Sequence, residues 1–274
     1  MLDSGILSQV RRKIGQADKL AYLICNPPRF RRQYPMMKKI MWGLRHLIFY
    51  VGLIPVTAFF GVLSPILICL PKRFSYWFIT RWSYFFVFWA CSTLGLRYRV
   101  RGKMPPRTHP YVVVSNHQSA WETVFMQTLF PPQCWLLKRE LLFIPFFGWG
   151  LAALRPIAIR REKGGAYSQL LRKGKERLKE GRWVIVFPEG TRVLPGHYRR
   201  FARGGAGLAM ESQTPIIPVA HNAGVFWPRG WWVKKPGTIQ VAIGPVIHPK
   251  PDESVSDLND RVEAWIRDAM QNMM

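Results

Sequence analysis

His117 and Glu122 lie five residues apart, directly after the apolar run of residues 111–115. On one regular helix their side chains would be rotated by about 140 degrees from each other and would not meet. We therefore expect His117 in a strand-to-helix turn, with Glu122 reaching back from the first turn of the helix. In that arrangement a carboxylate fixes the imidazole tautomer and leaves the other ring nitrogen to take a proton from a hydroxyl. Taken alone, such a pair is more often an ordinary hydrogen-bonded pair.

A second polar group follows another apolar run, residues 183–187, and reads Phe-Pro-Glu-Gly-Thr-Arg from Phe187 to Arg192. A proline, a glycine and two charges in a strand exit suit a loop that presents Arg192 and backbone N–H groups to an anion. The alternative is a solvated turn with a local pair between Glu189 and Arg192. Further along, two prolines bracket the apolar residues of 214–219, which predicts an edge strand or the wall of a site.

In this order and at this spacing, the three blocks resemble the 1-acylglycerol-3-phosphate acyltransferases of the glycerolipid acyltransferase superfamily. The resemblance covers about residues 98–245 and includes residues 138–148, which read KRELLFIPFFG. That family is marked by His-x-x-x-x-Asp, by Phe-Pro-Glu-Gly-Thr-Arg and by an Ile-x-Pro-Val-like block. The resemblance implies that His117 is the general base and that Glu122 orients it. It also implies a site for the acceptor's phosphate formed by Glu189, Gly190, Thr191, Arg192 and Arg161.

The chain departs from the family's pattern at two places. Glu122 stands where most members have Asp, which lengthens the side chain by one methylene but keeps its charge and acceptor capacity. Arg160 and Arg161 stand where the family often has Asp-Arg, so Arg161 can keep a phosphate-binding role while Arg160 replaces an acid. This second departure concerns the identity of the acceptor more than the reaction. Arg203 is a further candidate, displaced by one position from the usual Lys.

The implied reaction needs no nucleophile from the protein. His117 removes a proton from the acceptor hydroxyl as that oxygen attacks the thioester of acyl-CoA or acyl carrier protein, and Glu122 stabilises the imidazolium. Backbone N–H groups near Gly190 are expected to hold the oxyanion. With lysophosphatidic acid as the acceptor, the product is phosphatidic acid. Ser119 fits a helix cap or a turn better than a nucleophile, and no metal or organic cofactor is implied.

The two polar groups need strands to position them, and the chain after Arg97 alternates between strand and helix patterns. Compact apolar runs predict strands at residues 98–101, 111–115, 133–137, 156–159, 183–187, 215–219 and 238–243. Helices are predicted at residues 120–129 and 167–180. A final amphipathic helix is predicted with Leu258, Val262 and Ile266 on its apolar face and Ser256 as its N-cap. The alternation predicts an α/β fold, a mainly parallel sheet flanked by helices, with sites at the carboxyl ends of strands.

Residues 1–96 are predicted to form a basic segment and a membrane-embedded helical region, and residues 97–274 the α/β acyltransferase domain. Residues 1–46 carry ten Lys or Arg against two Asp. Residues 47–70 carry no charge, a run long enough for a hydrocarbon core that needs about 20 helical residues. Two prolines interrupt this run and basic residues flank both of its ends, which weakens a simple crossing. Residues 82–96 predict a return crossing or a helical hairpin dipping into one leaflet, with a buried helix pair as the alternative.

The charge balance favours an anionic partner, because 40 Lys and Arg against 15 Asp and Glu give a formal charge of +25. The usual nucleic-acid modules are missing from the sequence, so we expect no nucleic acid as a partner. The expected partners are lysophosphatidic acid, an acyl donor, an anionic phospholipid membrane and an acidic acyl carrier protein. The four cysteines are too widely spaced for a disulfide framework or a structural metal. With no cleavable signal peptide predicted, we expect a protein bound to the bacterial inner membrane, its catalytic domain on the cytoplasmic side.

Three alternatives stay open at this point. In the first, the acceptor is a different lipid, either another lysolipid or an acyl-amino-acid lipid. In the second, the chain is a basic membrane adaptor without catalytic activity. In the third, His117 activates water and the chain is a thioester hydrolase. The intact His-Glu pair and the intact hexapeptide count against the adaptor. Transfer of an acyl group to added lysolipid, as opposed to release of free acid, separates the hydrolase from the acyltransferase.

Overall fold

The structure is a computed structural model that describes residues 36–130, 132–159, 165–230 and 234–273. The chain divides into two compact units, Met1–Met41 and Trp42–Met274. Most of the basic segment predicted before position 46 lies outside the described residues, and so do Arg160 and Arg161. The elements below belong to the second unit, apart from the first residues of α2.

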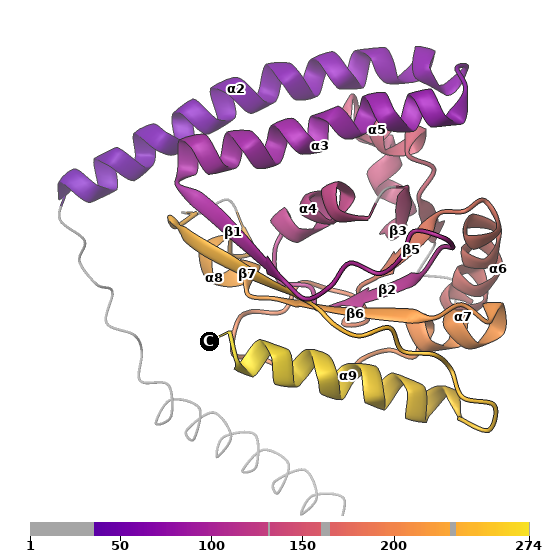
Figure 1. The fold of residues 1–274 in the computed structure, drawn as a ribbon. Helices are drawn as coiled ribbons and strands as arrows, with labels where there is room; N and C mark the ends of the chain where they lie inside the picture. The colour runs from indigo at the N-terminus through magenta and orange to yellow at the C-terminus, as the bar shows by residue number, and fades with distance from the viewer. Residues whose placement is uncertain (1–35, 131, 160–164, 231–233, 274) are drawn as a thin grey trace, which may run out of the picture. The chain divides into compact units, whose positions relative to one another are not determined.

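Two long helices open the described chain, and short strands and helices alternate after them (Figure 1). The helices are α2 (Met36–Ile68), α3 (Lys72–Leu94), α4 (Trp121–Leu129), the 3-10 helix η1 (Arg139–Phe143), α5 (Phe147–Ala153), α6 (Ala166–Lys179), α7 (Gly204–Ser212), α8 (Ala223–Phe226) and α9 (Val255–Gln271). The strands are β1 (Leu96–Arg101), β2 (Val112–Ser115), β3 (Gln133–Lys138), β4 (Ile157–Ile159), β5 (Trp183–Val186), β6 (Ile216–His221) and β7 (Gly237–Ile243). All of the predicted strands and helices are present, with slightly shifted bounds.

The strands form one sheet in the order β1-β7-β6-β2-β5-β3-β4. Neighbouring strands are parallel except β6 and β7, so the predicted mainly parallel sheet is confirmed. The expectation of an edge strand at residues 214–219 is wrong, because β6 lies inside the sheet between β7 and β2. Pro218 is tolerated there because it stands one residue before Val219, where the ladder with β7 begins. Its carbonyl still accepts a hydrogen bond from the N–H of Gly244 at 2.8 Å.

Side chains of the central strands alternate between two apolar layers, one on each face of the sheet. Val113 of β2 and Ile185 of β5 pack in the layer shared with α2, α3, α4 and α5. Val112 and Val114 point the other way and pack with α6, α7 and α9. Because both faces are covered, the central strands are continuous apolar runs. Figure 1 shows the α2–α3 hairpin and α4 on one side of the sheet and α9 on the other.

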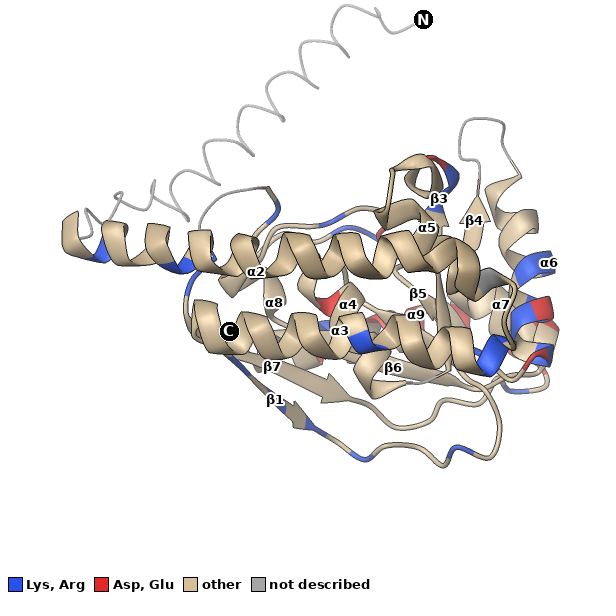
Figure 2. Ribbon diagram, turned by 90° about the horizontal axis from the view of Figure 1, so that it is seen from above, with Lys and Arg blue, Asp and Glu red and all other residues tan. Residues whose placement is uncertain are grey.

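Helices α2 and α3 lie side by side as a hairpin, seen from above in Figure 2. The indole N–H of Trp89 in α3 donates to the carbonyl of Phe49 in α2 at 2.9 Å. Pro55 and Pro65 lie within α2 without ending it. Among the described residues, one helix, Met36–Leu67, is long and apolar enough to cross a membrane. The helical hairpin is therefore confirmed as a fold element, and its insertion into a membrane stays a prediction.

The C-terminal helix α9 covers the sheet as predicted, but its cap differs from the prediction. Leu258 and Ile266 are buried against the sheet. The N-cap is Ser254, and the expected cap at Ser256 is wrong. The Ser254 hydroxyl accepts from the N–H of Asp257 at 3.1 Å, and the Asp257 carboxylate accepts from the N–H of Ser254 at 3.3 Å. This reciprocal capping box satisfies two backbone donors and fixes the start of the helix two residues earlier.

Candidate active site

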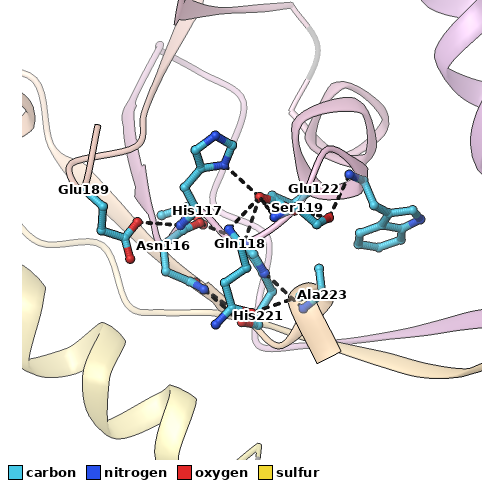
Figure 3. A network of polar contacts seen from close by, with 11 residues as sticks. Asn116, His117, Gln118, Ser119, Glu122, Glu189, His221 and Ala223 are labelled. Atoms are coloured by element: carbon cyan, nitrogen blue, oxygen red, sulfur yellow. Dashed lines mark hydrogen bonds and ion pairs between the residues drawn. The ribbon is translucent and has the colours of Figure 1, made fainter. Parts of the chain in front are cut away.

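His117 lies in the turn between β2 and α4, and Glu122 lies in the first turn of α4 (Figure 3). The strand ends at Ser115 and the helix begins at Trp121. The Nδ1 atom of His117 lies 2.8 Å from Oε1 of Glu122. The predicted geometry, a turn histidine met by a carboxylate from the first helical turn, is confirmed. The catalytic roles of the two side chains stay predictions.

Three further donors from the same turn bind the carboxylate of Glu122. The N–H of Gln118 donates to Oε1 at 2.9 Å, and the N–H of Ser119 donates to both oxygens at 2.8 and 3.0 Å. The Ser119 hydroxyl donates to Oε2 at 2.7 Å and accepts from the N–H of Trp121 at 2.9 Å. Ser119 is thus a turn residue, as predicted, and its hydroxyl is engaged with the carboxylate.

The carboxyl of Glu122 is ionised although its side chain is only 1% exposed. Burial alone raises the pKa of a carboxyl, but here the nearby His221 and His117 rings and the Ser119 hydroxyl outweigh burial. The pKa of Glu122 is therefore lowered to about 2. An ionised acceptor at Nδ1 holds the proton of the neutral His117 ring on Nδ1, which makes Nε2 the basic atom.

The loop after β5 contacts His117 from another direction (Figure 3). Oε2 of Glu189 accepts from the backbone N–H of His117 at 2.6 Å, and the N–H of Val193 donates to the carbonyl of His117 at 2.8 Å. The ring of Phe187 stacks on the imidazole, with ring centroids 4.4 Å apart. The structure thus brings the hexapeptide and the His117 turn together into one site, although 72 positions separate His117 from Glu189.

Glu189 holds its proton more strongly than an ordinary glutamate. Burial is the main cause, and the charge of Glu122 acts in the same direction, while the N–H of His117 opposes them. Together they raise the pKa of Glu189 to about 8. The resemblance places Glu189 in the phosphate site, whereas its described contact is with the main chain of His117. Glu189 therefore positions the His117 turn, and a contact with phosphate stays a prediction.

Gly190, Thr191 and Arg192 complete the hexapeptide. Gly190 has a φ of +68°, in the left-handed region that favours glycine, and its N–H donates to the carbonyl of Phe187 at 3.0 Å. The Gly190 amide is thus engaged within the turn, and the expectation that backbone N–H groups near Gly190 hold an oxyanion stays a prediction. Thr191 is half-buried and Arg192 is exposed. Binding of phosphate by these residues stays a prediction.

The two other predicted arginines, Arg161 and Arg203, have no described contact with the site. Arg161 lies within residues 160–164, outside the described part of the chain, as does Arg160. Arg203 is exposed at the N-cap of α7, where its carbonyl accepts from the N–H of Gly207 at 2.8 Å. Its role in binding phosphate has no support in these contacts.

Asn116 and His221 belong to the site and were not assigned a role by sequence reasoning. The Asn116 amide donates to the backbone carbonyl of His221 at 2.9 Å and accepts from the backbone N–H of His221 at 3.0 Å. The His221 ring contacts the backbone carbonyl of Asn116 through Nε2 at 2.8 Å. The signal in the sequence is weak. His221 is the last residue of β6, the strand beside β2, and it directly follows the apolar residues of that strand.

The His221 ring is buried and faces Glu122, with Nε2 4.0 Å from Oε1. Burial lowers the pKa of His221 more than the charge of Glu122 and the bond to Asn116 raise it. The neutral ring donates from Nε2 to the Asn116 carbonyl, while Nδ1 accepts from the N–H of Ala223 at 3.3 Å. His221 thus ties the end of β6 to the turn that carries His117, and β6 does form a wall of the site, as expected.

An apolar cavity of about 430 Å³ adjoins this site. Ala120 of the His117 turn and Arg192 of the hexapeptide line it, which links the cavity to both loops. Most other lining side chains are apolar and come from the hairpin, α4, β3 and α5, among them Leu53, Phe60, Ile79, Trp82, Val124, Trp135, Leu137, Phe147 and Leu151. Such a cavity suits a hydrocarbon chain. The described residues contain no cluster of His, Cys, Asp or Glu that could hold a metal ion.

Comparison with known proteins agrees with this chemistry. A family model described as Acyltransferase matches residues 97–222. A 1-acyl-sn-glycerol-3-phosphate acyltransferase of Pseudomonas aeruginosa is 45% identical over 236 residues, which cover 83% of this chain and 91% of the relative. A Saccharomyces cerevisiae protein of the same name is 32% identical over 167 residues, and this chain spans 54% of its length.

A solved structure shares the fold. The crystal structure of the 1-acyl-sn-glycerophosphate acyltransferase PlsC from Thermotoga maritima superposes with a TM-score of 0.72 and covers 86% of this chain and 97% of that one. The sequences are 24% identical, so this likeness concerns the architecture alone.

Proposed function

Since this chain belongs to the 1-acyl-sn-glycerol-3-phosphate acyltransferase family, we propose that it transfers a fatty acyl group to the free hydroxyl of a 1-acylglycerol 3-phosphate and forms phosphatidic acid. One observation carries the proposal: the 2.8 Å contact between His117 and a buried, ionised Glu122, beside an apolar cavity. This arrangement provides a base for a hydroxyl and a place for an acyl chain.

In the proposed reaction, Nε2 of His117 takes the proton of the acceptor hydroxyl as its oxygen attacks the thioester carbonyl carbon. The new C–O bond forms, and the tetrahedral intermediate then expels the thiolate. The imidazolium returns its proton to that thiolate, which restores the neutral ring. Glu122 stabilises the imidazolium between these two steps, because its charge lies against Nδ1. The reaction as written uses no metal or organic cofactor.

We assign the cavity to the acyl chain of the donor, acyl-CoA or acyl carrier protein. Arg192 lines the cavity next to the base and is exposed on its other side, which suits an anion at the cavity mouth. Its planar guanidinium can bind two phosphate oxygens at once. Gly190 and Thr191 adjoin it in the same loop. Arg161 joins this proposed phosphate site on the strength of the family resemblance.

We further propose that the hairpin docks in one leaflet of an anionic phospholipid membrane. Exposed apolar side chains line α2, among them Leu47, Val51, Ile54, Phe59 and Val62. The inner face of the same hairpin lines the cavity, so the proposed docking brings the cavity close to the acyl chains of lipids. The formal charge of +25 adds attraction for anionic headgroups and for an acidic carrier protein. The bacterial inner membrane, with the catalytic domain on its cytoplasmic side, is the proposed location.

A panel of lysolipids incubated with the purified protein and labelled acyl-CoA tests the proposed reaction. We expect acylated lysophosphatidate, identified by its mass, and no product with His117→Ala. Preferential acylation of another lysolipid would replace the acceptor, and release of free acid alone would identify a hydrolase. Binding to lipid without acyl transfer or hydrolysis would identify the membrane adaptor.

A further inference from the structure

A short turn between η1 and α5 exposes a cluster of large apolar side chains, which we call the 143–149 tip. Phe143 is 72% exposed, and Ile144, Phe146 and Trp149 are exposed as well. Clusters of this kind are rare on surfaces that face water only. We propose that the 143–149 tip is a second membrane-inserting element, which binds the apolar part of an anionic phospholipid bilayer beside the hairpin. The inference rests on the proposed docking of the hairpin.

The backbone of the tip holds these side chains outward. Phe146 adopts φ +61° and ψ −56°, a costly conformation for a bulky side chain. Two short-range hydrogen bonds maintain the turn: the N–H of Phe147 donates to Pro145 at 2.6 Å, and that of Gly148 donates to Ile144 at 2.7 Å. These two bonds close the turn that carries the exposed side chains.

The tip continues the apolar surface of α2, although the two segments lie far apart in the sequence. A Cβ atom at Gly61 would lie 2.6 Å from the Cβ of Phe146, so glycine permits the tip to pack directly on the helix. Phe59 and Val62, on either side of Gly61, are exposed. Figures 1 and 2 both show α5 beside the second half of α2. A bilayer that covers α2 at this level therefore also reaches the tip.

The charges at the base of the tip suit a headgroup layer. Lys138 and Arg139 are exposed at the start of η1, and Arg139 lies 6.0 Å from the ring of Phe143. Glu140 is the one acidic neighbour among the described residues of this segment. Two cations next to exposed aromatic rings are the composition expected of a segment that binds an anionic membrane surface.

The same segment forms part of the cavity wall. Leu141, Phe146 and Phe147 line the cavity, while Phe143 and Ile144 point to the outside. Insertion of the tip therefore places the cavity wall among the lipid acyl chains. After transfer, the acyl chain, now part of the product, can move sideways from the cavity into the bilayer without being exposed to water.

Site-specific fluorescence on the full chain tests the tip separately from the hairpin. Cys25, Cys69 and Cys91 are replaced by Ser, buried Cys134 is kept, and activity is checked. A nitrobenzoxadiazole label is then placed at one introduced cysteine: Phe143→Cys in the tip, Val51→Cys in α2, or Tyr198→Cys as a control. Tyr198 is exposed and packs against Arg267 of α9, on the opposite face of the sheet.

The labels are read in phosphatidylglycerol vesicles that carry a spin-label quencher on the acyl chains. We expect quenching at positions 51 and 143 and none at 198. Quenching at 51 without quenching at 143 overturns the inference and leaves hairpin docking intact. If neither is quenched, hairpin docking fails, and the tip inference fails with it, while the acyl-transfer reaction is judged separately by its product. A concentration-dependent blue shift at 143 without lipid, and no quenching in vesicles, assigns the tip to a second copy of the chain and overturns the inference.

A charge substitution gives an independent functional measurement. Phe143 does not line the cavity, and Phe143→Glu is expected to lower acyl transfer to lysophosphatidate in vesicles by about tenfold or more, since a charge opposes insertion. In detergent micelles the same variant is expected to match the parent within about twofold. Tyr198→Glu, the matched control, is expected to match the parent in both. An undiminished rate of Phe143→Glu in vesicles, or a loss that is equal in vesicles and micelles, would contradict the inference, because in neither case does the effect of the charge depend on a bilayer.

Discussion

One glutamate is buried against His117 after β2 and another after β5, and the pKa values of the two carboxyls are shifted in opposite directions. Glu122 follows β2 and has a pKa lowered to about 2, whereas Glu189 follows β5 and has a pKa raised to about 8. Both are almost fully buried, at 1% and 6% exposure. Burial therefore does not decide which of them carries the charge.

The difference lies in the groups that face each carboxyl, among them the nearby His221 ring, which lowers the pKa of Glu122 most. Glu122 accepts from the imidazole of His117, from two backbone N–H groups and from the Ser119 hydroxyl. The described contact of Glu189 is with one backbone N–H, that of His117, and the charge of Glu122 already present nearby raises its pKa further. Donors aimed at one carboxyl make it the charged partner of the base, and the second carboxyl then stays neutral.

The largest expected effect comes from removing the charge at the β2 exit. Glu122→Gln is expected to lower kcat by about a thousandfold or more, because an amide carries no charge and can hold the wrong tautomer of His117. Glu122→Asp is expected to keep more activity than Glu122→Gln. Initial rates with lysophosphatidate and acyl-CoA, at matched amounts of folded protein, measure both.

A double variant sharpens this expectation. His117→Ala is expected to be at least as damaging as Glu122→Gln, and the double variant to lose little beyond the worse single one, since groups acting as one unit are not additive. Near-normal turnover in Glu122→Gln would show that the carboxylate only supports the fold of the turn.

The next effect concerns Arg192 at the β5 exit, which we assign to binding and not to the chemical step. Arg192→Lys keeps the charge but loses the two-pronged donor, and we expect the KM for lysophosphatidate to rise about tenfold or more. The KM for acyl-CoA is expected to change little. Separate Michaelis constants for the two substrates measure this, and a rise confined to acyl-CoA would move Arg192 to the donor site.

Glu189 is expected to affect stability more than rate. Its pKa is about 8 in the folded chain and 4.5 as an ordinary glutamate, so between these values the folded state keeps a proton that the unfolded state loses. The contribution of Glu189 to stability is therefore fully present below pH 4.5 and is lost as pH rises through 8. Glu189→Gln does not titrate and removes this slope, of up to about 1.4 kcal/mol per pH unit.

Unfolding free energies measured in urea between pH 6 and pH 9 check this expectation. The difference between the parent and Glu189→Gln is expected to grow in favour of the variant as pH rises. Glu189→Ala serves as a control that also loses the acceptor for the N–H of His117. A difference that is independent of pH would mean that Glu189 is ionised throughout this range.

The smallest expected effect on rate comes from Ser119→Ala. The variant loses the hydroxyl donor to Oε2 of Glu122, but the N–H of Ser119 and the other donors stay. We expect kcat to fall by less than about tenfold, equivalent to about 1.4 kcal/mol. Ser119→Thr restores the hydroxyl and is expected to recover the rate. A loss as large as that of Glu122→Gln would make Ser119 an essential member of the pair.

Local sequence was sufficient to predict the β2 exit. The five-residue spacing of His117 and Glu122 excludes a single helix and leaves the strand-to-helix turn that the structure contains. The hexapeptide was likewise predicted to follow a strand, and it does. These predictions succeeded because each depends on neighbours in the chain, whose conformations are coupled by helix and strand geometry.

Features that depend on strand order could not be predicted from the sequence. The pairing of Asn116 with His221 joins residues 105 positions apart and depends on β6 lying next to β2. The same strand order makes β6 a central strand, against the expectation drawn from its prolines. The opposite pKa shifts of Glu122 and Glu189 were also hidden, because they depend on burial and on groups far apart in the sequence, His221 beside Glu122 and the N–H of His117 beside Glu189.

The 105-residue separation of Asn116 and His221 fixes the order in which a newly made chain can mature. Synthesis runs from the N-terminus, so α2 and α3 leave the ribosome long before β6 exists. The apolar hairpin is then complete while the turn of His117 still lacks its tie to β6. A chain that is arrested or cleaved before Ile216 therefore contains the hairpin but lacks the contacts with β6 that hold the turn of His117.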